Sequence, residues 1–382
     1  MKKVLLASSA LALVGSFASP AAAAEWNMRV GGYMNQAVGF ADVDANFSGE
    51  FDGVDVYSDT EIHFVPSITL DNGIQFGANI QLEAGGYLST SDTIDEQYMF
   101  IKGSFGEVLL GSENSAGYKM SYGAPTVTSM VVNSGSLQIF IPFSGGGAAS
   151  GVFRGVMGTT FLENSRNNDA QRFTYFTPRM AGFQLGASYA RDGNQDTFAQ
   201  LDSDSTLSDI FDVGANYVNS FGEVSVALSG RYGTASAPSG PDPDIWAVGL
   251  NVGFSGFTIG GSYAEQNDAG VLDGEAWDVG VTYKTGPWGF GLTYFKGKSV
   301  GDPDGTGVFA FSTSTGKGVE GKTPESGNET LEQYLVGISY DLGTGVSLGG
   351  FFGYVDFDDA SAGEQDDSID GWVLGTEFNI SF

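Results

Sequence analysis

The sequence contains no cysteine and only one histidine, His63. Without cysteine, the chain can form neither a disulfide nor a thiolate metal site. One histidine cannot supply a histidine-rich zinc site, and the H-E-x-x-H motif is absent. We therefore predict no metal centre of these kinds and no catalytic residue that depends on one.

Basic residues are also scarce. The chain has 16 Lys and Arg against 46 Asp and Glu, a formal net charge of −30. A surface this acidic repels nucleic acid, so we expect no nucleic-acid partner. Comparable acidity is usual in Lys/Glu-rich helical or disordered chains, but 58 glycines and 13% aromatic residues argue against both classes.

Long hydrophobic runs are missing as well, so we predict no transmembrane helix. The N-terminus has two lysines, an apolar stretch at 4–14 and a small-residue segment at 18–24 that ends in an A-x-A pattern. This order is typical of a secretory signal peptide, and its apolar stretch is too short to span a bilayer. We therefore expect residues 1–24 to be removed and residues 25–382 to form the mature domain.

What the sequence does contain is strict alternation of apolar and polar residues. From Ile74 to Glu83 every second residue is apolar, which places all the apolar side chains on one face of a strand. Segments of about 9–12 residues suit tilted strands that cross a membrane. Sixteen segments are predicted, at 26–40, 57–70, 74–84, 96–103, 107–112, 169–177, 182–190, 210–219, 223–232, 244–254, 257–265, 275–284, 288–296, 330–341, 346–356 and 370–382.

The connectors between these segments alternate in length. Tight turns rich in Gly, Asn and Asp, such as 71–73 and 255–256, alternate with long polar connectors, as at the two rims of an outer-membrane barrel. Aromatic residues gather at the strand ends, where two interfacial girdles are expected. A soluble β-sandwich also alternates, but the second face here is too polar for a dry core. We predict an all-β fold, a 16-stranded antiparallel transmembrane β-barrel.

Two stretches resemble a known family. Residues 25–33 (EWNMRVGGY), and 172–178 (RFTYFTP) together with 182–189 (GFQLGASY), are similar to strands of Gram-negative general diffusion porins, particularly the alphaproteobacterial type, and the terminal Phe382 resembles their C-terminal assembly signal. The resemblance implies a homotrimer in the outer membrane of a Gram-negative bacterium. Its expected partners are outer-membrane lipid, lipopolysaccharide and the barrel-assembly machinery.

The resemblance also implies that the long third loop is folded inward and narrows the channel. The longest connector, 113–168, is the third. Enterobacterial porins carry a P-E-F-G-G-D motif there, whereas this chain has PFSGGG at 142–147 and lacks both acids. The charged residues of the predicted constriction loop are Glu113, Lys119, Arg154, Glu163 and Arg166.

Strand parity predicts which side chains face the lumen. A lipid-facing arginine near the bilayer midplane costs roughly 2–4 kcal/mol, so charged residues on the strands belong inside. The predicted pore-lining residues are Arg29, Glu61, His63, Gln81, Glu83, Arg172, Asp212, Arg231, Asp278 and Glu377.

The function expected from this pattern is a water-filled channel for passive diffusion of ions and small hydrophilic solutes, not an enzyme. A substrate-selective channel is the alternative, although aromatic or arginine ladders are not evident along the lumen. A barrel hydrolase with His63 as general base and a surface adhesin are weaker alternatives.

No cofactor is expected, but three external connectors are rich in carboxylates that could bind Ca²⁺ or Mg²⁺. They are 41–56, 191–209 and 357–369. The EF-hand spacing fails at 42–47, because Phe47 stands where glycine is needed. A solvated acidic rim is the simpler interpretation.

Overall fold

The structure is a computed structural model. It describes residues 25–45, 52–85, 94–141, 155–163, 168–193, 207–269, 273–299, 329–358 and 368–382. The predicted signal peptide, residues 1–24, lies outside the described residues.

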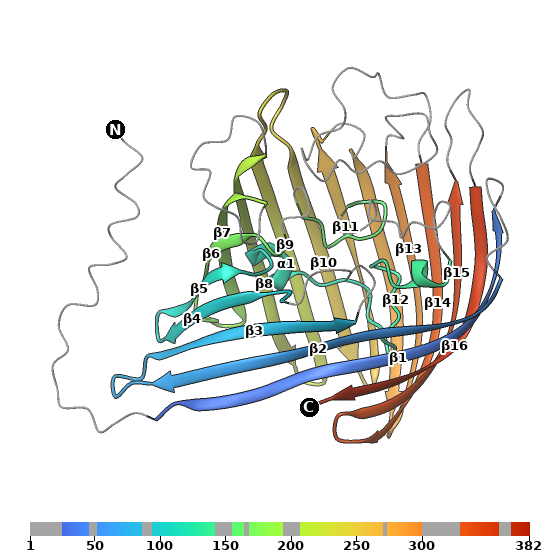
Figure 1. The fold of residues 1–382 in the computed structure, drawn as a ribbon, viewed down its shortest axis with the longest axis horizontal. Helices are drawn as coiled ribbons and strands as arrows, with labels where there is room; N and C mark the ends of the chain where they lie inside the picture. The colour runs from blue at the N-terminus through green and yellow to red at the C-terminus, as the bar shows by residue number, and fades with distance from the viewer. Residues whose placement is uncertain are drawn as a thin grey trace.

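The described residues form a closed antiparallel barrel of sixteen strands (Figure 1). Each strand pairs with its sequence neighbours, and β1 pairs with β16 to close the ring. The strands are β1 (Asn27–Ala45), β2 (Gly53–Thr69), β3 (Gln75–Gly85), β4 (Gln97–Gly103), β5 (Gly106–Ser112), β6 (Gln171–Phe176), β7 (Phe183–Asp192), β8 (Ser208–Phe221), β9 (Val224–Ser236), β10 (Asp244–Phe254), β11 (Phe257–Asn267), β12 (Gly274–Thr285), β13 (Trp288–Ser299), β14 (Glu329–Gly343), β15 (Val346–Asp358) and β16 (Ser368–Ser381).

This architecture confirms the predicted 16-stranded barrel. Several strands continue past their predicted ends on the side of the long connectors, as β1 does to Ala45 and β9 to Ser236. Hydrophobic alternation fades there, but backbone pairing continues, for example between Asp358 and Ser368. The backbones of polar residues can form strand hydrogen bonds outside the hydrocarbon layer as well as within it. The apolar pattern therefore marks only the part of a strand that crosses the membrane and underestimates the length of the strand.

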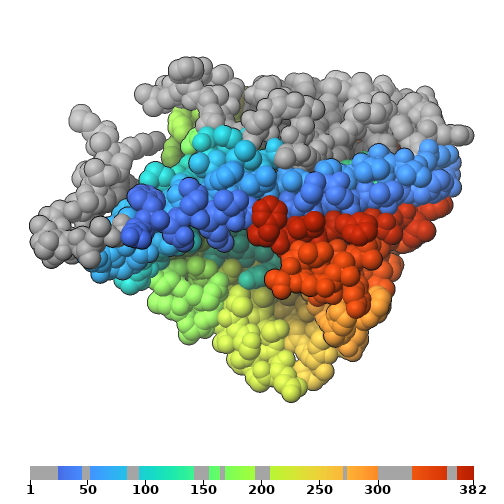
Figure 2. Space-filling model, turned by 60° about the horizontal axis from the view of Figure 1, so that its bottom comes forward, coloured from blue at the N-terminus to red at the C-terminus, as the bar shows by residue number. Residues whose placement is uncertain are grey.

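The outer face of the barrel is apolar and the period-two pattern explains it. On β16, Leu374 is 59% exposed and Phe378 is 57% exposed, while Val373 and Glu377, the residues before them in the chain, are fully buried. Where β1 lies beside β16, the outer wall is continuous (Figure 2). None of the helices among the described residues is long and apolar enough to span a membrane.

Aromatic pairs lie on the outer face near both ends of the strands. The ring centroids of Trp277 and Tyr294 are 4.9 Å apart towards the long connectors, and those of Phe257 and Tyr283 are 4.3 Å apart towards the short turns. Amphipathic rings at these two levels suit the two membrane interfaces.

The third connector, between β5 and β6, contains a short helix α1 (Ala116–Met120) and a 3₁₀ turn η2 (Leu137–Ile139). Its described part lies within the ring of strands (Figure 1) and packs apolar side chains against inward-facing residues of the wall. Leu137, Ile141 and Met157 belong to one buried cluster with Phe351 and Val373. We expected the inward faces of all the strands to be polar. Where strands face the connector, their inward side chains are instead partly apolar, because they form a water-free core with the connector.

Candidate functional site

The ten predicted pore-lining residues all occupy inward-facing positions in the strand register, but their burial divides them. Arg29 is exposed, and His63 and Glu83 are partly exposed, so these side chains can contact water in the lumen. Glu61 and Gln81 are nearly buried. The other five are no more than 6% exposed, because the third connector covers them: Arg172, Asp212, Arg231, Asp278 and Glu377.

The first buried group holds α1 against the wall. The Arg231 Nη2 atom lies 2.5 Å from Asp212 Oδ2 and 3.7 Å from Glu163 Oε2. Asp212 also accepts a hydrogen bond from the backbone N–H of Gly117. Glu163 Oε1 accepts one from the Ser115 hydroxyl at 2.8 Å. The guanidinium charge is therefore shared between one wall carboxylate and one connector carboxylate, both out of water.

Two further wall carboxylates bind the backbone of the connector. Asp278 on β12 accepts a hydrogen bond from the N–H of Ala124 at 3.1 Å. Glu377 on β16 accepts hydrogen bonds from the N–H of Ser129, at 3.0 and 3.1 Å, and from its hydroxyl at 2.6 Å. On β14, Gln333 Nε2 donates to the Val132 carbonyl at 3.0 Å. Bonds to ionised acceptors are stronger than neutral ones, so these contacts fix the connector at successive points.

Glycine on the wall makes this close approach feasible. A Cβ atom at Gly249 would lie 1.8 Å from the carbonyl oxygen of Tyr122, and one at Gly297 would lie 2.3 Å from that of Val156. Both distances are far below contact distance, so any larger residue would displace the connector. The abundance of glycine in the chain thus has a local cause at these two positions.

The charged residues of the predicted constriction loop have different environments. Lys119 Nζ lies 2.8 Å from Glu113 Oε2 within the connector, and Glu163 contacts Arg231. Arg154 and Arg166 lie outside the described residues. Because Arg172 and Arg231 are buried, the wall arginines do not present a free row of positive charge to the lumen.

The inner wall is least covered on the short-turn halves of β1 and β2, whereas Phe140 of the connector lies against the other half of β1 at Gly39. The Tyr33 hydroxyl donates to Asp59 Oδ1 at 3.3 Å, and His63 Nε2 lies 3.2 Å from Glu61 Oε1. Strand parity predicted Glu61 and His63 as pore-lining residues. Asp59 lies on the same face of β2 but was not among the predicted residues. Among the described residues, no serine or threonine hydroxyl forms a hydrogen bond with His63, so its geometry gives no support to a hydrolase site.

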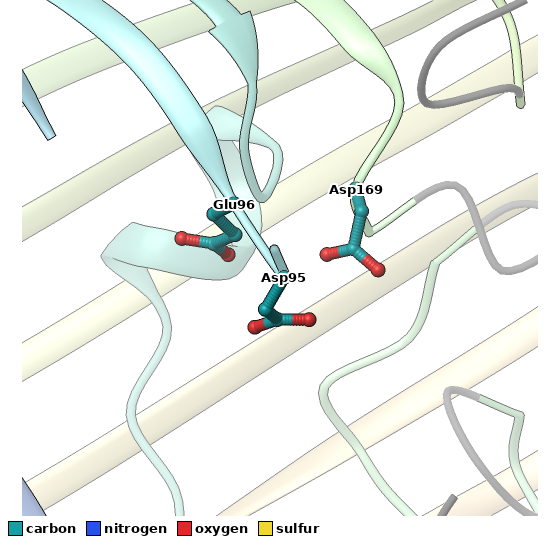
Figure 3. A group of neighbouring side chains, drawn as sticks. All are labelled: Asp95, Glu96 and Asp169. Atoms are coloured by element: carbon teal, nitrogen blue, oxygen red, sulfur yellow. The ribbon is translucent and has the colours of Figure 1, made fainter. Parts of the chain in front are cut away.

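A group of three carboxylates lies where the second and third connectors rejoin the barrel (Figure 3). Asp95 and Glu96 precede β4, Asp169 precedes β6, and carboxylate oxygens from all three lie within 4.8 Å of one another. Burial, with the nearby Glu113 carboxylate, raises the pKa of Glu96 to about 9. This group could not be predicted from the sequence, because the two segments are distant in the chain.

The three acidic connectors named as cation sites are only partly described. Asp42, Asp55 and Asp209 are among the described residues, but most of the acids, including Asp202, Glu364 and Asp366, lie outside them. Cation binding at these connectors stays a prediction.

Solved outer-membrane proteins share the fold. An outer-membrane protein of Vibrio cholerae, OmpT in its trimer form, superposes with a TM-score of 0.59 at 12% identity, covering 94% of this chain and 99% of that one. An anion-selective porin from Comamonas acidovorans gives 0.57 at 17% identity, covering 94% and 100%. The outer membrane channel DcaP of Acinetobacter baumannii gives 0.57 at 14% identity, covering 94% and 97%. At these identities the likeness is one of fold.

Relatives by sequence are found in Rickettsia. An uncharacterized protein of Rickettsia bellii is 29% identical over 219 residues, which are 50% of this chain and 48% of the relative. A second, from Rickettsia prowazekii, is 29% identical over 146 residues, 35% of this chain and 32% of the relative. The chain thus spans about half the length, or less, of the curated relatives that it matches.

The family model that describes Gram-negative porins matches residues 7–360, nearly the whole chain. Together with the closed barrel and its inward connector contacts, this match places the protein in the outer membrane: the chain belongs to the Gram-negative porin family.

Proposed function

We propose that the protein is a non-enzymatic channel through which ions and small hydrophilic solutes diffuse passively. The observation that carries this proposal is the division of the inner wall. Hydrogen bonds hold the third connector against β8, β12 and β16, while on the short-turn halves of β1 and β2 inward-facing side chains such as Arg29 and His63 remain at least partly exposed. Water and solutes can pass along this less covered part of the wall.

The test is electrical. Purified protein added to a planar bilayer should produce large ohmic current steps. Steps that a particular solute blocks at low concentration would favour the substrate-selective alternative instead. A folded, inserted protein that produces no steps would contradict the proposal.

We further propose that the third connector sets the width of the channel. Its support is the row of anchors on Asp212, Asp278 and Glu377, which hold the connector backbone against one side of the lumen. Substitutions that release these anchors should change the conductance, as developed in the Discussion.

Assembly as a homotrimer in contact with outer-membrane lipid and lipopolysaccharide is also proposed. The V. cholerae neighbour has a trimer form, and the apolar outer wall here fits lipid or a second copy. Cross-linking of the protein in native membranes should give a band of three times the monomer mass; a monomer alone would contradict the trimer. No resident cofactor is proposed for permeation.

Recognition by the barrel-assembly machinery is proposed to depend on Phe382. Its side chain is 63% exposed on the outer wall, and its backbone N–H and carbonyl exchange hydrogen bonds with Gly32 at 3.0 Å each. The terminal residue therefore takes part in closing β16 onto β1 and also presents an aromatic side chain to the outside.

A further inference from the structure

Inward-facing polar residues form a continuous row across five neighbouring strands. Each residue of this row is the direct register partner of the next: Asp341 (β14), Ser347 (β15), Asn379 (β16), Asn35 (β1) and Asp59 (β2). Directly opposed residues on antiparallel strands have Cβ atoms about 4.5–5.5 Å apart, so neighbouring side chains of the row can contact the same small molecule. None of the five residues is buried. We call this set the polar row.

A cavity of about 490 Å³ lies against the polar row. Its lining includes four members of the row together with two further inward-facing residues, Tyr33 and Ser381. The rest of the lining comes from the β14–β15 turn and the adjoining strand ends, and no described residue of the third connector belongs to it. Small-molecule sites in proteins have volumes of about 300–1,000 Å³, so the cavity has the size of a site for a small solute.

The polar row lies immediately beyond an anchor of the third connector. Glu377, which binds Ser129, is two residues from Asn379 on the same face of β16, and Asn379 Nδ2 donates to Glu377 Oε1 at 2.9 Å. Asn379 is the nearer of the two to the short-turn end of the barrel, where the Ser381 N–H donates to the Gly345 carbonyl. A solute that passes the connector towards the short turns therefore meets the polar row next.

Several hydrogen-bonding groups of the polar row are unused. Among the described residues, neither of its carboxylates takes part in a salt bridge, and that of Asp341 has no hydrogen-bond partner. Asp59 accepts a hydrogen bond from the Tyr33 hydroxyl at 3.3 Å. The Oδ1 atom of Asn379 accepts none, although its Nδ2 atom is engaged with Glu377. The row therefore offers mainly acceptors, and a ligand that binds there has to donate hydrogen bonds.

The chemistry of these groups selects a neutral solute with several hydroxyl groups. Carboxylates only accept hydrogen bonds, whereas amides and hydroxyls both donate and accept. One hydroxyl of a solute can donate to Asp341 in a charge-assisted bond while another accepts from the Ser347 hydroxyl beside it. An anion would be repelled, because the row contains two carboxylates and no basic side chain.

The polar row does not form a cage for one metal ion. Asp341 and Asp59 are separated by four strand spacings of about 4.8 Å, roughly 19 Å along the wall, so they cannot bind the same small cation. The three positions between them carry uncharged side chains. The row is therefore a track of hydrogen-bonding groups that leads along the wall of the lumen.

We propose that the polar row binds neutral sugars or polyols after they have passed the third connector. This inference rests on the proposed channel function and deepens it by naming a class of solute and the place where the solute binds. Binding has to be weak, because a conducting site must release its solute again. We therefore expect half-saturation at millimolar concentrations, which is compatible with passive diffusion.

The experiment measures the current through the protein in a planar bilayer while glucose is added on the side of the short turns. We expect a saturable decrease in single-channel current. Half-saturation should require at least fivefold more glucose in Asn35→Ala and in Asp341→Asn. Asn251→Ala is the matched control, because Asn251 faces inward on β10, outside the polar row, and its replacement should leave the glucose dependence unchanged. Equal glucose dependence in Asn35→Ala and the wild-type protein would overturn the site.

A comparison of solutes in the wild-type protein keeps the proposal testable if a variant does not fold. Triethylene glycol is similar in size to glucose, but its ether oxygens only accept hydrogen bonds, so its effect on the current should not saturate. Gluconate should not saturate either, because it is negatively charged. Saturation by triethylene glycol at the same concentration as glucose would refute recognition of hydroxyl groups. Saturation by glucosamine but not by glucose would also refute it, since the row would then recognise positive charge.

Binding can also be observed without any current. Saturation-transfer NMR between glucose and the folded full chain, in a detergent without a sugar headgroup, should give signals that disappear in the double variant Asn35→Ala/Asp341→Asn. Such signals from a protein that produces no current steps would contradict the channel function and leave the binding site standing. Ohmic steps that glucose does not affect, together with the absence of these signals, would overturn the binding site and leave the channel function standing.

Discussion

The contact between Glu377 and Ser129 offers a direct test of the anchored connector. Glu377 is fully buried and accepts hydrogen bonds from the Ser129 N–H, the Ser129 hydroxyl and the Asn379 side chain. Glu377→Gln keeps the size of the side chain but replaces one carboxylate oxygen with an N–H₂ group. That group would face donors, so at least one bond is lost and the others become neutral.

The magnitude follows from these contacts. Hydrogen bonds to charged groups contribute about 1.5–3 kcal/mol each, and neutral ones about 0.5–1.5 kcal/mol. We expect the docked state around Ser129 to lose about 2–4 kcal/mol relative to the detached state. At about 1.4 kcal/mol per factor of ten, this raises the detached population roughly 30- to 700-fold.

Two assays report the change. Hydrogen exchange at the Ser129 amide should accelerate by a similar factor, and single-channel recordings should show added current noise with a shifted mean conductance. Glu332→Gln is the control, since that carboxylate accepts bonds from Lys296 at 2.7 Å and Tyr294 at 2.9 Å on the outer face and contacts no described residue of the connector. Folded Glu377→Gln channels with unchanged exchange and unchanged noise would refute the anchoring role.

Three other predictions follow from the same geometry. Deletion of Phe382 removes two backbone hydrogen bonds at the β1–β16 closure and should strongly reduce insertion into the outer membrane; a normal yield of folded protein in membrane fractions would contradict this. Gly249→Val would force side-chain atoms into the carbonyl of Tyr122 and should change the conductance, whereas Gly230→Val, on β9 with open space around the position, should not. Reversal potentials under a KCl gradient should show cation preference that fades as salt increases, and Asp59→Asn should weaken it; anion preference at low salt would show that arginines control permeation.

The strands could be predicted from the sequence because a membrane barrel enforces a two-residue period on every one of them. Trp277, Val279 and Val281 must face lipid, so their positions fix the parity of β12 and place Asp278 inside. Closure and strand order then follow from short and long connectors that alternate. The same local rule cannot tell how far a strand extends beyond the hydrocarbon, as at the end of β15.

Burial of the inward residues could not be predicted in this way. Asp278 and His63 both face inward, but Asp278 is covered by Ala124 and Asn133, whereas His63 is partly exposed. Ser129, the connector residue that Glu377 contacts, is 248 positions away in the sequence. Such contacts depend on the path of the connector. The connector is irregular, so its sequence contains no repeating pattern from which that path could be predicted.

The prediction of pore-lining arginines illustrates the consequence. Parity placed Arg172 and Arg231 on the inner wall, where exposed positive charges would oppose the passage of cations. In the structure Arg231 lies between Asp212 and Glu163, and both arginines are removed from water. A buried and paired guanidinium contributes little to the potential along the lumen, since the adjacent carboxylates cancel most of its field.

The inward-facing polar residues therefore have two different roles, and the alternating pattern in the sequence does not distinguish them. On β8, β12 and β16, carboxylates are paired with the connector and act as its fixed attachment points. On β2, Asp59 is partly exposed and accepts a hydrogen bond from the Tyr33 hydroxyl at 3.3 Å. Its carboxyl group borders the part of the lumen that the connector leaves open, so it adds to the attraction for cations that the acidic composition of the chain produces.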